Sequence, residues 1–260
     1  MTGRSEPLKQ SGPGTGERSR GDARTRWGDR AAALYTEAYA ERYRAHDESI
    51  GPAHAVGRLS DWLQAVCDRF ERPIDALDLG CGTGRYFHAL SHVRRLVGID
   101  VSPAMLDRAR RPAGTIALIP GGLTLVEGDF LTHEFQADAF DLVYSIGVLA
   151  EHSPFDMTIA ARVKRWLRPG GRFAFTTVHP GSFSVTRTLK RRAGEWLLSL
   201  GGVVSAGMRH GLRDRLMSDG LYADEERVRE VLAAVDLDIE SLEPFTSDVH
   251  LHTLTVAVKR

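Results

Sequence analysis

Short, nearly continuous apolar runs alternate with amphipathic segments along the middle of the chain. The apolar runs lie at 74–79, 95–100, 123–127, 140–145 and 172–178. Such runs are typical of strands that are buried on both faces of a parallel sheet. The segments between them, at about 85–92, 103–110 and 154–167, have helical periodicity, and the last two open with Ser-Pro, an N-cap signal. This alternation predicts an α/β fold with right-handed crossovers.

The N-terminal region departs from this alternation. Residues 1–27 carry almost no apolar side chains, so they predict a disordered tail. Helical patterns follow, one from Ala31 onward and one over 55–70. Tyr35, Tyr39 and Tyr43 are spaced to share one face of the first helix, either as a packed aromatic stripe or as part of a lid over a ligand.

The C-terminal region completes a single domain over 28–260. A helix is predicted at 224–235 and strands at 238–242 and 250–258, and the short link between these strands predicts an antiparallel hairpin at the sheet edge. An insertion at about 180–222 precedes them, and we interpret it as a helical cap over the substrate. Its basic residues outnumber its acidic ones. This excess of positive charge fits either a cap that attracts an anionic acceptor or a charged surface that faces solvent.

A glycine-rich turn follows the first predicted strand, in the segment Asp78-Leu79-Gly80-Cys81-Gly82-Thr83-Gly84. Glycines permit positive φ and leave no Cβ between backbone and ligand. Ligands of open α/β sheets bind at the carboxyl ends of the strands, and a helix N-terminus there would add partial positive charge. The dinucleotide pattern GxGxxG fails in both registers, because Arg85 and Phe87 replace its third glycine, and the ending of a P-loop is absent.

The segment DLGCGTG resembles motif I of the class I S-adenosylmethionine-dependent methyltransferases. Further segments resemble that family in the same order: GIDVSPAML at 98–106, VEGDF at 126–130, FDLV at 140–143 and LRPGG at 167–171. The resemblance spans about 76–178. It implies S-adenosylmethionine as the cofactor and a Rossmann-like seven-stranded, mostly parallel sheet, with helices on both faces and an antiparallel C-terminal strand.

The resemblance also implies roles for single residues. Asp100 would bind the ribose hydroxyls, although an aspartate at a strand end can also cap the next helix, and Asp129 would bind the adenine amino group. The stripe from Tyr35 to Tyr43 lies where many members place an N-terminal lid tyrosine near the cofactor carboxylate. The whole predicted cofactor set is Tyr35, Tyr43, Asp78, Gly80, Cys81, Gly82, Gly84, Asp100, Val101, Met105, Gly128, Asp129, Phe130, Ser145 and Ile146.

Catalytic residues are harder to predict than cofactor-binding ones. Methyl transfer from a sulfonium is an in-line displacement that mainly needs the nucleophile to be positioned and freed of water. A general base is needed only when the acceptor must first lose a proton. The candidates are Glu151 and His152 after the fourth predicted strand and His179 after the fifth. Each could instead be an ordinary loop or capping residue.

The composition limits the kinds of binding partner that we expect. The 34 Lys and Arg residues balance 34 Asp and Glu residues, so no polyanion footprint is present, and sequence elements of nucleic-acid methyltransferases are absent. No apolar run reaches the ~18–20 residues of a membrane span. Two cysteines fit a reducing cytoplasm and supply no metal cluster.

We therefore expect a cytoplasmic enzyme that methylates oxygen, nitrogen or carbon of a small molecule, without metal, nucleic acid or membrane. The alternatives are a protein or nucleic-acid methyltransferase, or a protein that binds S-adenosylmethionine without methylating, because a fold does not determine function. The acceptor and the oligomeric state stay open.

Overall fold

The computed structural model describes residues 27–29, 31–49, 55–113, 122–182, 221–247 and 250–260. The predicted tail at 1–26 and most of the predicted cap, 183–220, lie outside the described residues. Trp27, which composition assigned to the tail, is helical and packs against the core. No helix among the described residues has both the length and the apolar character needed to cross a membrane.

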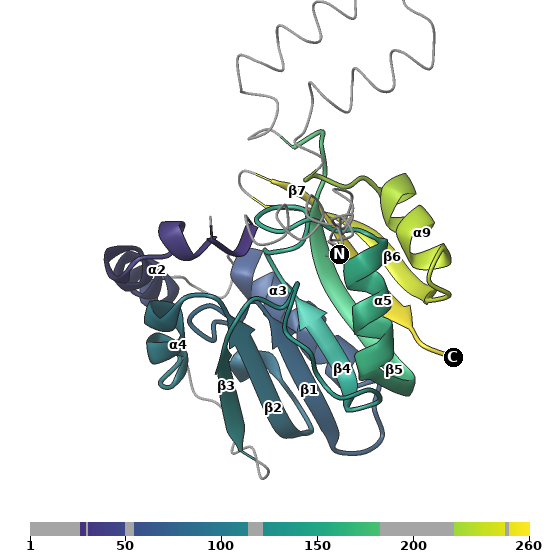
Figure 1. Ribbon diagram of the computed structural model, residues 1–260, viewed down its shortest axis with the longest axis horizontal. Coiled ribbons are helices and arrows are strands. Elements are labelled where there is room, and N and C mark those ends of the chain that lie inside the picture. The colour runs from purple at the N-terminus through teal and green to yellow at the C-terminus, as the bar shows by residue number, and fades with distance from the viewer. Residues whose placement is uncertain (1–26, 30, 50–54, 114–121, 183–220, 248–249) are drawn as a thin grey trace, which may run out of the picture.

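Seven strands form one sheet in the order β3-β2-β1-β4-β5-β7-β6 (Figure 1). Neighbours from β3 to β5 are parallel, whereas β7 is antiparallel to both β5 and β6. The predicted Rossmann-like sheet and its antiparallel C-terminal strand are confirmed. The strands are β1 (Ile74–Leu79), β2 (Val93–Asp100), β3 (Leu123–Glu127), β4 (Phe140–Ser145), β5 (Leu167–Val178), β6 (Asp238–Thr246) and β7 (Leu251–Val258).

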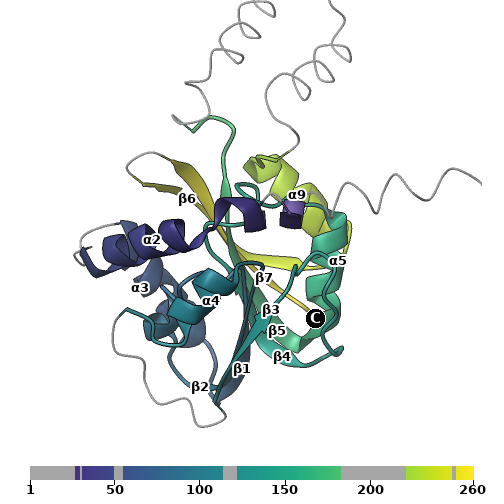
Figure 2. The ribbon, with the colours of Figure 1, turned by 60° about the vertical axis from the view of Figure 1, so that its left-hand side comes forward.

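Helices cover both faces of the sheet, as predicted. Alternate strand residues face opposite sides, so in β1 Ala76 packs in one core cluster and Leu77 in the other. Figure 2 shows α2, α3 and α4 on one side of the sheet and α5 and α9 on the other. These helices are α2 (Glu37–Ser49), α3 (Ala55–Cys67), α4 (Pro103–Ala109), α5 (Met157–Trp166) and α9 (Glu225–Ala233).

The prediction of an α-helix at 85–92 is wrong. Only a short 3₁₀ helix, η1 (Phe87–Ala89), forms there. The Gly84 N–H donates to the Cys81 carbonyl and the Phe87 N–H to the Gly84 carbonyl, which is the three-residue spacing of 3₁₀ turns. The glycine-rich turn therefore does not lead into an α-helix, and the expected charge of an α-helix N-terminus does not contribute to the site.

Two other boundaries differ from prediction. Helix α5 is capped by Asp156, whose Oδ1 accepts from the N–H groups of Thr158 and Ile159, and not by Ser153. The Pro-Gly-Gly segment does not form a turn outside the strand. Strand β5 begins at Leu167 and continues through it, with Gly170 at a φ of +77°.

Buried ion pairs fasten the amino-terminal ends of the strands. Asp75 and Asp141 are 2% and 1% exposed. Arg168 donates to both carboxylates, at 3.0 Å and 2.6 Å, and the Asp75 N–H donates to Asp141 at 2.8 Å. Burial raises the pKa of Asp75, but hydrogen bonds from Arg94 and Arg168 outweigh it, so this pKa lies below its ordinary value. Motif residues Asp141 and Arg168 are thus structural.

We expect Asp141→Ala to lower the free energy of unfolding by about 2–3 kcal/mol, below the range for fully buried pairs because the arginines reach solvent. The substitution leaves the Asp75 N–H without its buried acceptor, and Arg168 keeps only Asp75 as a buried partner. Urea unfolding monitored by circular dichroism measures it. Glu230→Ala, which removes an exposed pair with Arg227 at 3.4 Å, is the control and should cost no more than about 0.5 kcal/mol. Equal losses would show that the buried pairs do not fasten the sheet.

Candidate functional site

A cavity of about 380 Å³ lies at the carboxyl ends of the central strands, next to α2. It occupies the place where the strand order reverses between β1 and β4, the point at which open α/β sheets bind ligands. Most of the predicted site residues line it: Tyr35, Tyr43, Asp78, Gly80, Cys81, Gly82, Asp100, Val101, Met105, Asp129, Phe130, Ile146, Glu151 and His152.

The glycine-rich turn is tied to the end of β2 by its own backbone. The N–H groups of Gly80 and Cys81 donate to the Ile99 carbonyl at 2.8 Å and 3.0 Å. The Gly82 N–H donates to Asp100 Oδ2 at 2.9 Å. Gly80 and Gly82 have φ values of +76° and +53°, a conformation that other residues adopt only with strain. The glycines are therefore needed for the shape of the turn.

Asp100 connects this turn to the start of α4. Its second oxygen, Oδ1, accepts from the Ser102 N–H at 2.9 Å. Ser102, and not Asp100, caps α4, since its Oγ accepts from the Met105 N–H. Burial raises the pKa of Asp100, although these backbone N–H groups oppose the shift. Each carboxylate oxygen keeps a further lone pair that can accept from a ligand hydroxyl.

Asp78 is the second buried acid of the cavity and is 4% exposed. Burial, together with the charge of Asp100, raises its pKa from 3.8 to about 8, and the nearby Tyr144 hydroxyl opposes the shift only in part. A buried carboxylate without a cation is costly. A positively charged ligand group would remove that cost.

Helix α2 closes the cavity over the glycine-rich turn. Asp47 accepts from Thr83 Oγ1 at 2.7 Å and from Arg85 Nε at 2.5 Å, and the Arg85 guanidinium stacks over the Tyr43 ring at 4.0 Å. The expected helix from Ala31 is interrupted at Tyr35, whose carbonyl accepts from Ser102 Oγ at 2.7 Å. The tyrosines line the cavity, so they act as its wall and not only as a packed stripe.

Asp129 lies at the end of the cavity formed by the loop after β3. Its Oδ1 accepts from the Leu131 N–H at 2.8 Å, and burial raises its pKa. A Cβ on Gly28 would lie 2.5 Å from Asp129 Oδ2, so the N-terminal segment reaches this carboxylate. Sequence reasoning missed both Gly28 and Asp47, because neither belongs to a motif or a periodic pattern.

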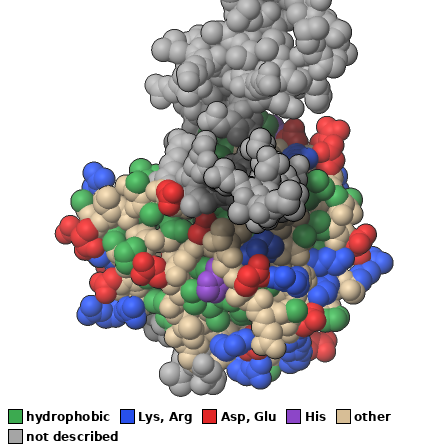
Figure 3. All heavy atoms as spheres, in the orientation of Figure 1, with side chains coloured by type: hydrophobic (Ala, Val, Ile, Leu, Met, Phe, Trp, Pro, Cys, Tyr) green, Lys and Arg blue, Asp and Glu red, His purple; other side chains and the backbone are tan. Residues whose placement is uncertain are grey.

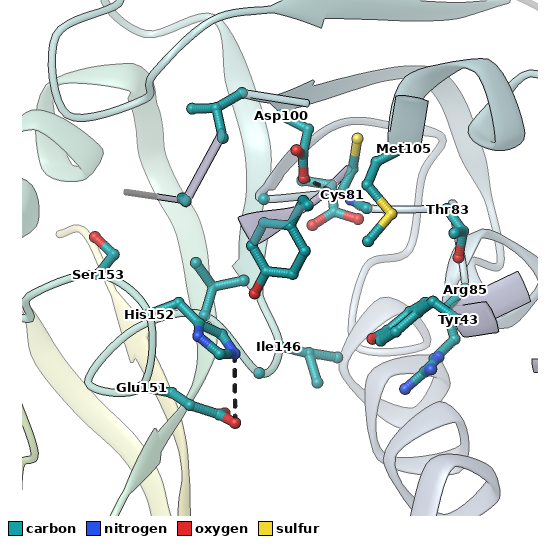
Figure 4. A pocket seen from close by; sticks show the side chains of 18 of the residues that line it. Tyr43, Cys81, Thr83, Arg85, Asp100, Met105, Ile146, Glu151, His152 and Ser153 are labelled. Carbon is teal, nitrogen blue, oxygen red and sulfur yellow. Dashed lines mark hydrogen bonds and ion pairs between the residues drawn. The ribbon is translucent and has the colours of Figure 1, made fainter. Parts of the chain in front are cut away.

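Glu151 and His152 belong to a tight loop after β4. Ala150 has a φ of +56°, and the His152 N–H donates to the Val148 carbonyl at 2.9 Å. Figure 4 shows His152 Nε2 facing Glu151 Oε1, 3.6 Å away, on one side of the cavity, with Tyr43 and Arg85 on the other. Burial raises the pKa of Glu151 to about 7 and lowers that of His152.

Two further histidines line the cavity at the start of β7, His250 and His252. Their rings lie 5.5 Å apart. Burial lowers the pKa of His252 to about 4, helped by the nearby His250, so its imidazole is neutral at pH 7. Sequence reasoning missed both residues, since only the antiparallel insertion of β7 beside β5 brings them to the site.

Four predicted residues lie outside the lining. The Gly84 Cβ position is 2.7 Å from the Phe87 ring, and the Gly128 N–H donates to the Asp100 carbonyl at 2.9 Å. Ser145 Oγ donates to the Leu79 carbonyl at 2.9 Å. His179 Nδ1 accepts from the Gly181 N–H at 2.8 Å. Gly84, Gly128 and Ser145 support the walls of the cavity. His179 does not line the cavity, and its catalytic role stays a prediction.

Comparison with known proteins decides the family. A family model described as a methyltransferase domain matches residues 76–171, from β1 to the start of β5. Residues 76–171 of the chain therefore form a methyltransferase domain. The resemblance seen in motif I is confirmed, and the matched segment includes the glycine-rich turn, Asp100 and Asp129.

Individual relatives of the methyltransferase domain differ in their acceptors. The chain is 31% identical over 179 residues to trans-aconitate 2-methyltransferase of Deinococcus radiodurans, covering 67% of this chain and 63% of that protein. It is 36% identical over 131 residues to tRNA U34 carboxymethyltransferase of Shewanella baltica, covering 46% of this chain and 37% of that protein. The chain thus spans less than two thirds of the length of these relatives.

A solved structure shares the fold of the methyltransferase domain at low identity. Magnesium protoporphyrin IX methyltransferase from Synechocystis PCC 6803, crystallised with bound S-adenosylmethionine, superimposes with a TM-score of 0.61. It is 14% identical and covers 90% of this chain and 97% of that one. This likeness supports the arrangement of the sheet and helices.

Two glycine substitutions test how closely the methyltransferase turn is packed. A Cβ on Gly80 would lie 2.7 Å from Val148 Cγ2, whereas a Cβ on Gly82 would meet nothing within 4 Å. Both would be strained by positive φ. We expect Gly82→Ala to cost about 1 kcal/mol and Gly80→Ala about 2–3 kcal/mol in urea unfolding, because only the second adds a clash. A Gly80→Ala protein as stable as Gly82→Ala would contradict this packing.

The pH dependence of stability tests the burial of Asp78. Its folded pKa of about 8 lies above its ordinary value of 3.8, so the folded protein binds more protons than the unfolded chain between these values. Stability is therefore lost as pH rises through this window, at ~1.4 kcal/mol per unit of pKa difference. The stability of Asp78→Asn relative to wild type should grow from pH 4 to 8. A stability difference between Asp78→Asn and wild type that is constant with pH would refute the raised pKa of Asp78.

Proposed function

We propose that the protein is an S-adenosylmethionine-dependent methyltransferase that transfers the methyl group to oxygen, nitrogen or carbon of a small-molecule acceptor. One observation carries this proposal: the cavity over the glycine-rich turn is lined by acids. They are Asp78, Asp100, Asp129 and Glu151. Arg85 is the only Lys or Arg among the described lining residues, and Asp47 already pairs with it. Such a lining suits a sulfonium donor, which carries net positive charge.

Each part of the donor has a matching residue. Asp100 is positioned to accept from ribose hydroxyls, because both oxygens retain lone pairs and backbone N–H groups hold the carboxylate in place. Asp129 would accept from the adenine amino group, with Phe130 and Met105 as apolar neighbours in the lining. When bound, S-adenosylmethionine supplies an activated methyl group.

The protein's own contribution is positioning and exclusion of water. Helix α2 covers the cavity through Asp47, and Tyr35 and Tyr43 contribute apolar wall. Displacement at carbon needs the nucleophile in line with the departing sulfur and stripped of solvent. Glu151 and His152 are the proton acceptors that line the cavity among the predicted catalytic residues, so we assign any general-base role to them before His179.

The small-molecule acceptor is supported by the surface as well as by the cavity. Basic and acidic side chains are interspersed over the face that Figure 3 shows, without the single-sign stripe expected of a nucleic-acid-binding surface. The relatives named above include a tRNA enzyme, so an RNA or protein acceptor is the alternative. Release of S-adenosylhomocysteine with pools of small metabolites, RNA and protein separates them, and turnover of RNA or protein alone would overturn the small-molecule assignment.

Asp100→Ala tests the donor site directly. Removing hydrogen bonds from a charged acceptor to two hydroxyls should weaken binding of S-adenosylhomocysteine about 100-fold, as measured by isothermal titration calorimetry. Asp107→Ala, on the exposed face of α4, is the matched control and should bind like wild type. Wild-type affinity in Asp100→Ala would refute the proposed site, and absence of binding by the wild type would refute the function.

A further inference from the structure

The cavity has further polar groups besides those assigned above to ribose and adenine. Glu151, His152, Thr176 and His252 line it at the ends of β4 and β5 and the start of β7. Glu151 Oε2 lies 3.9 Å from the Cβ position of Gly147, just beyond β4. In Figure 4 the Glu151 and His152 side chains face each other, apart from Asp100 and Cys81. We call the end of the cavity that these four residues line its acceptor end.

Glu151 is a half-buried acid without a permanent cation. Its contact with a basic side chain among the described residues is with His152, 3.6 Å away. Burial, followed by the neighbouring His250, lowers the pKa of His152, so this ring is neutral at pH 7. Burial likewise raises the pKa of Glu151 to about 7. A carboxylate held in this way gains from any ligand that brings a positive charge.

Resting on the methyltransferase function proposed above, we propose that the acceptor is an amine that enters as its ammonium ion and is methylated on nitrogen. The ammonium pairs with Glu151. An ammonium has three donors, no acceptor and the positive charge that this carboxylate lacks. A carboxylate acceptor would place like charges together, and a hydroxyl brings one donor and no charge.

The reaction balances with the groups at hand. An ammonium beside a sulfonium is unfavourable, and Glu151 offsets that repulsion during binding. The ammonium then gives one proton to the neutral His152, which frees the nitrogen lone pair. That lone pair forms the new bond to the methyl carbon, and the carbon–sulfur bond breaks with its electron pair remaining on sulfur. The products are the methylated ammonium and S-adenosylhomocysteine, and His152 releases its proton to solvent.

Small probes of equal size test the acceptor class without knowledge of the natural substrate. The protein is first saturated with S-adenosylhomocysteine, and the affinities of propylammonium, 1-propanol and butanoate are measured by ligand-observed NMR at constant ionic strength. We expect propylammonium to bind at least fivefold more tightly than either of the others. In Glu151→Gln its affinity should fall about tenfold and the preference over butanoate should disappear.

A matched control separates the local carboxylate from the overall charge. Glu226→Gln removes an exposed acid on α9 and should leave the affinity for propylammonium unchanged. Propylammonium binding no tighter than butanoate, including no binding of either, overturns the amine acceptor, as does full affinity in Glu151→Gln. Butanoate binding most tightly would instead support an anionic acceptor. Failure of S-adenosylhomocysteine itself to bind overturns the methyltransferase function, which distinguishes the two failures.

Discussion

The hydrogen bond from the Gly82 N–H to the Asp100 carboxylate is the contact on which the rest of the site depends. It joins the turn after β1 to the end of β2, and the other oxygen of the same carboxylate holds the start of α4 through Ser102. Ser102 in turn holds the Tyr35 carbonyl, which brings the N-terminal segment over the cavity. One carboxylate thus organises three segments while keeping lone pairs for a ligand.

The sheet and the gathering of most predicted site residues around one cavity were predictable because each depends on short-range sequence patterns. Continuous apolar runs such as 140–145 are typical of strands buried on both faces of a sheet, and motif residues lie directly at strand ends, where the fold brings them together. The helix expected at 85–92 failed because its periodicity is short, and hydrogen bonds of the glycine-rich turn continue into it with 3₁₀ spacing. Asp47 and His252 could not be found in this way, since only tertiary packing brings them to the cavity.

The two ends of the strands handle charge in opposite ways. At the amino-terminal ends, Asp75 and Asp141 are buried with arginines, and hydrogen bonds from Arg94 and Arg168 hold the pKa of Asp75 below its ordinary value. At the carboxyl-terminal ends, burial without a cation raises the pKa of Asp78 and Glu151. The first arrangement stabilises the empty protein, and the second destabilises it until a cationic ligand binds. Stability and ligand recognition are therefore separated along the strands.

The segments that form the walls of the cavity differ in how freely their residues can be substituted. The turn at 80–84 is constrained by the positive φ of its glycines, whereas the residues that line the cavity at the start of β7 have no such constraint. Replacement of His250 or His252 would therefore reshape that wall without moving Gly82 or Asp100. On the proposed function, a lineage carrying this domain could exchange one acceptor for another by a few substitutions there, while the turn that holds the donor is preserved.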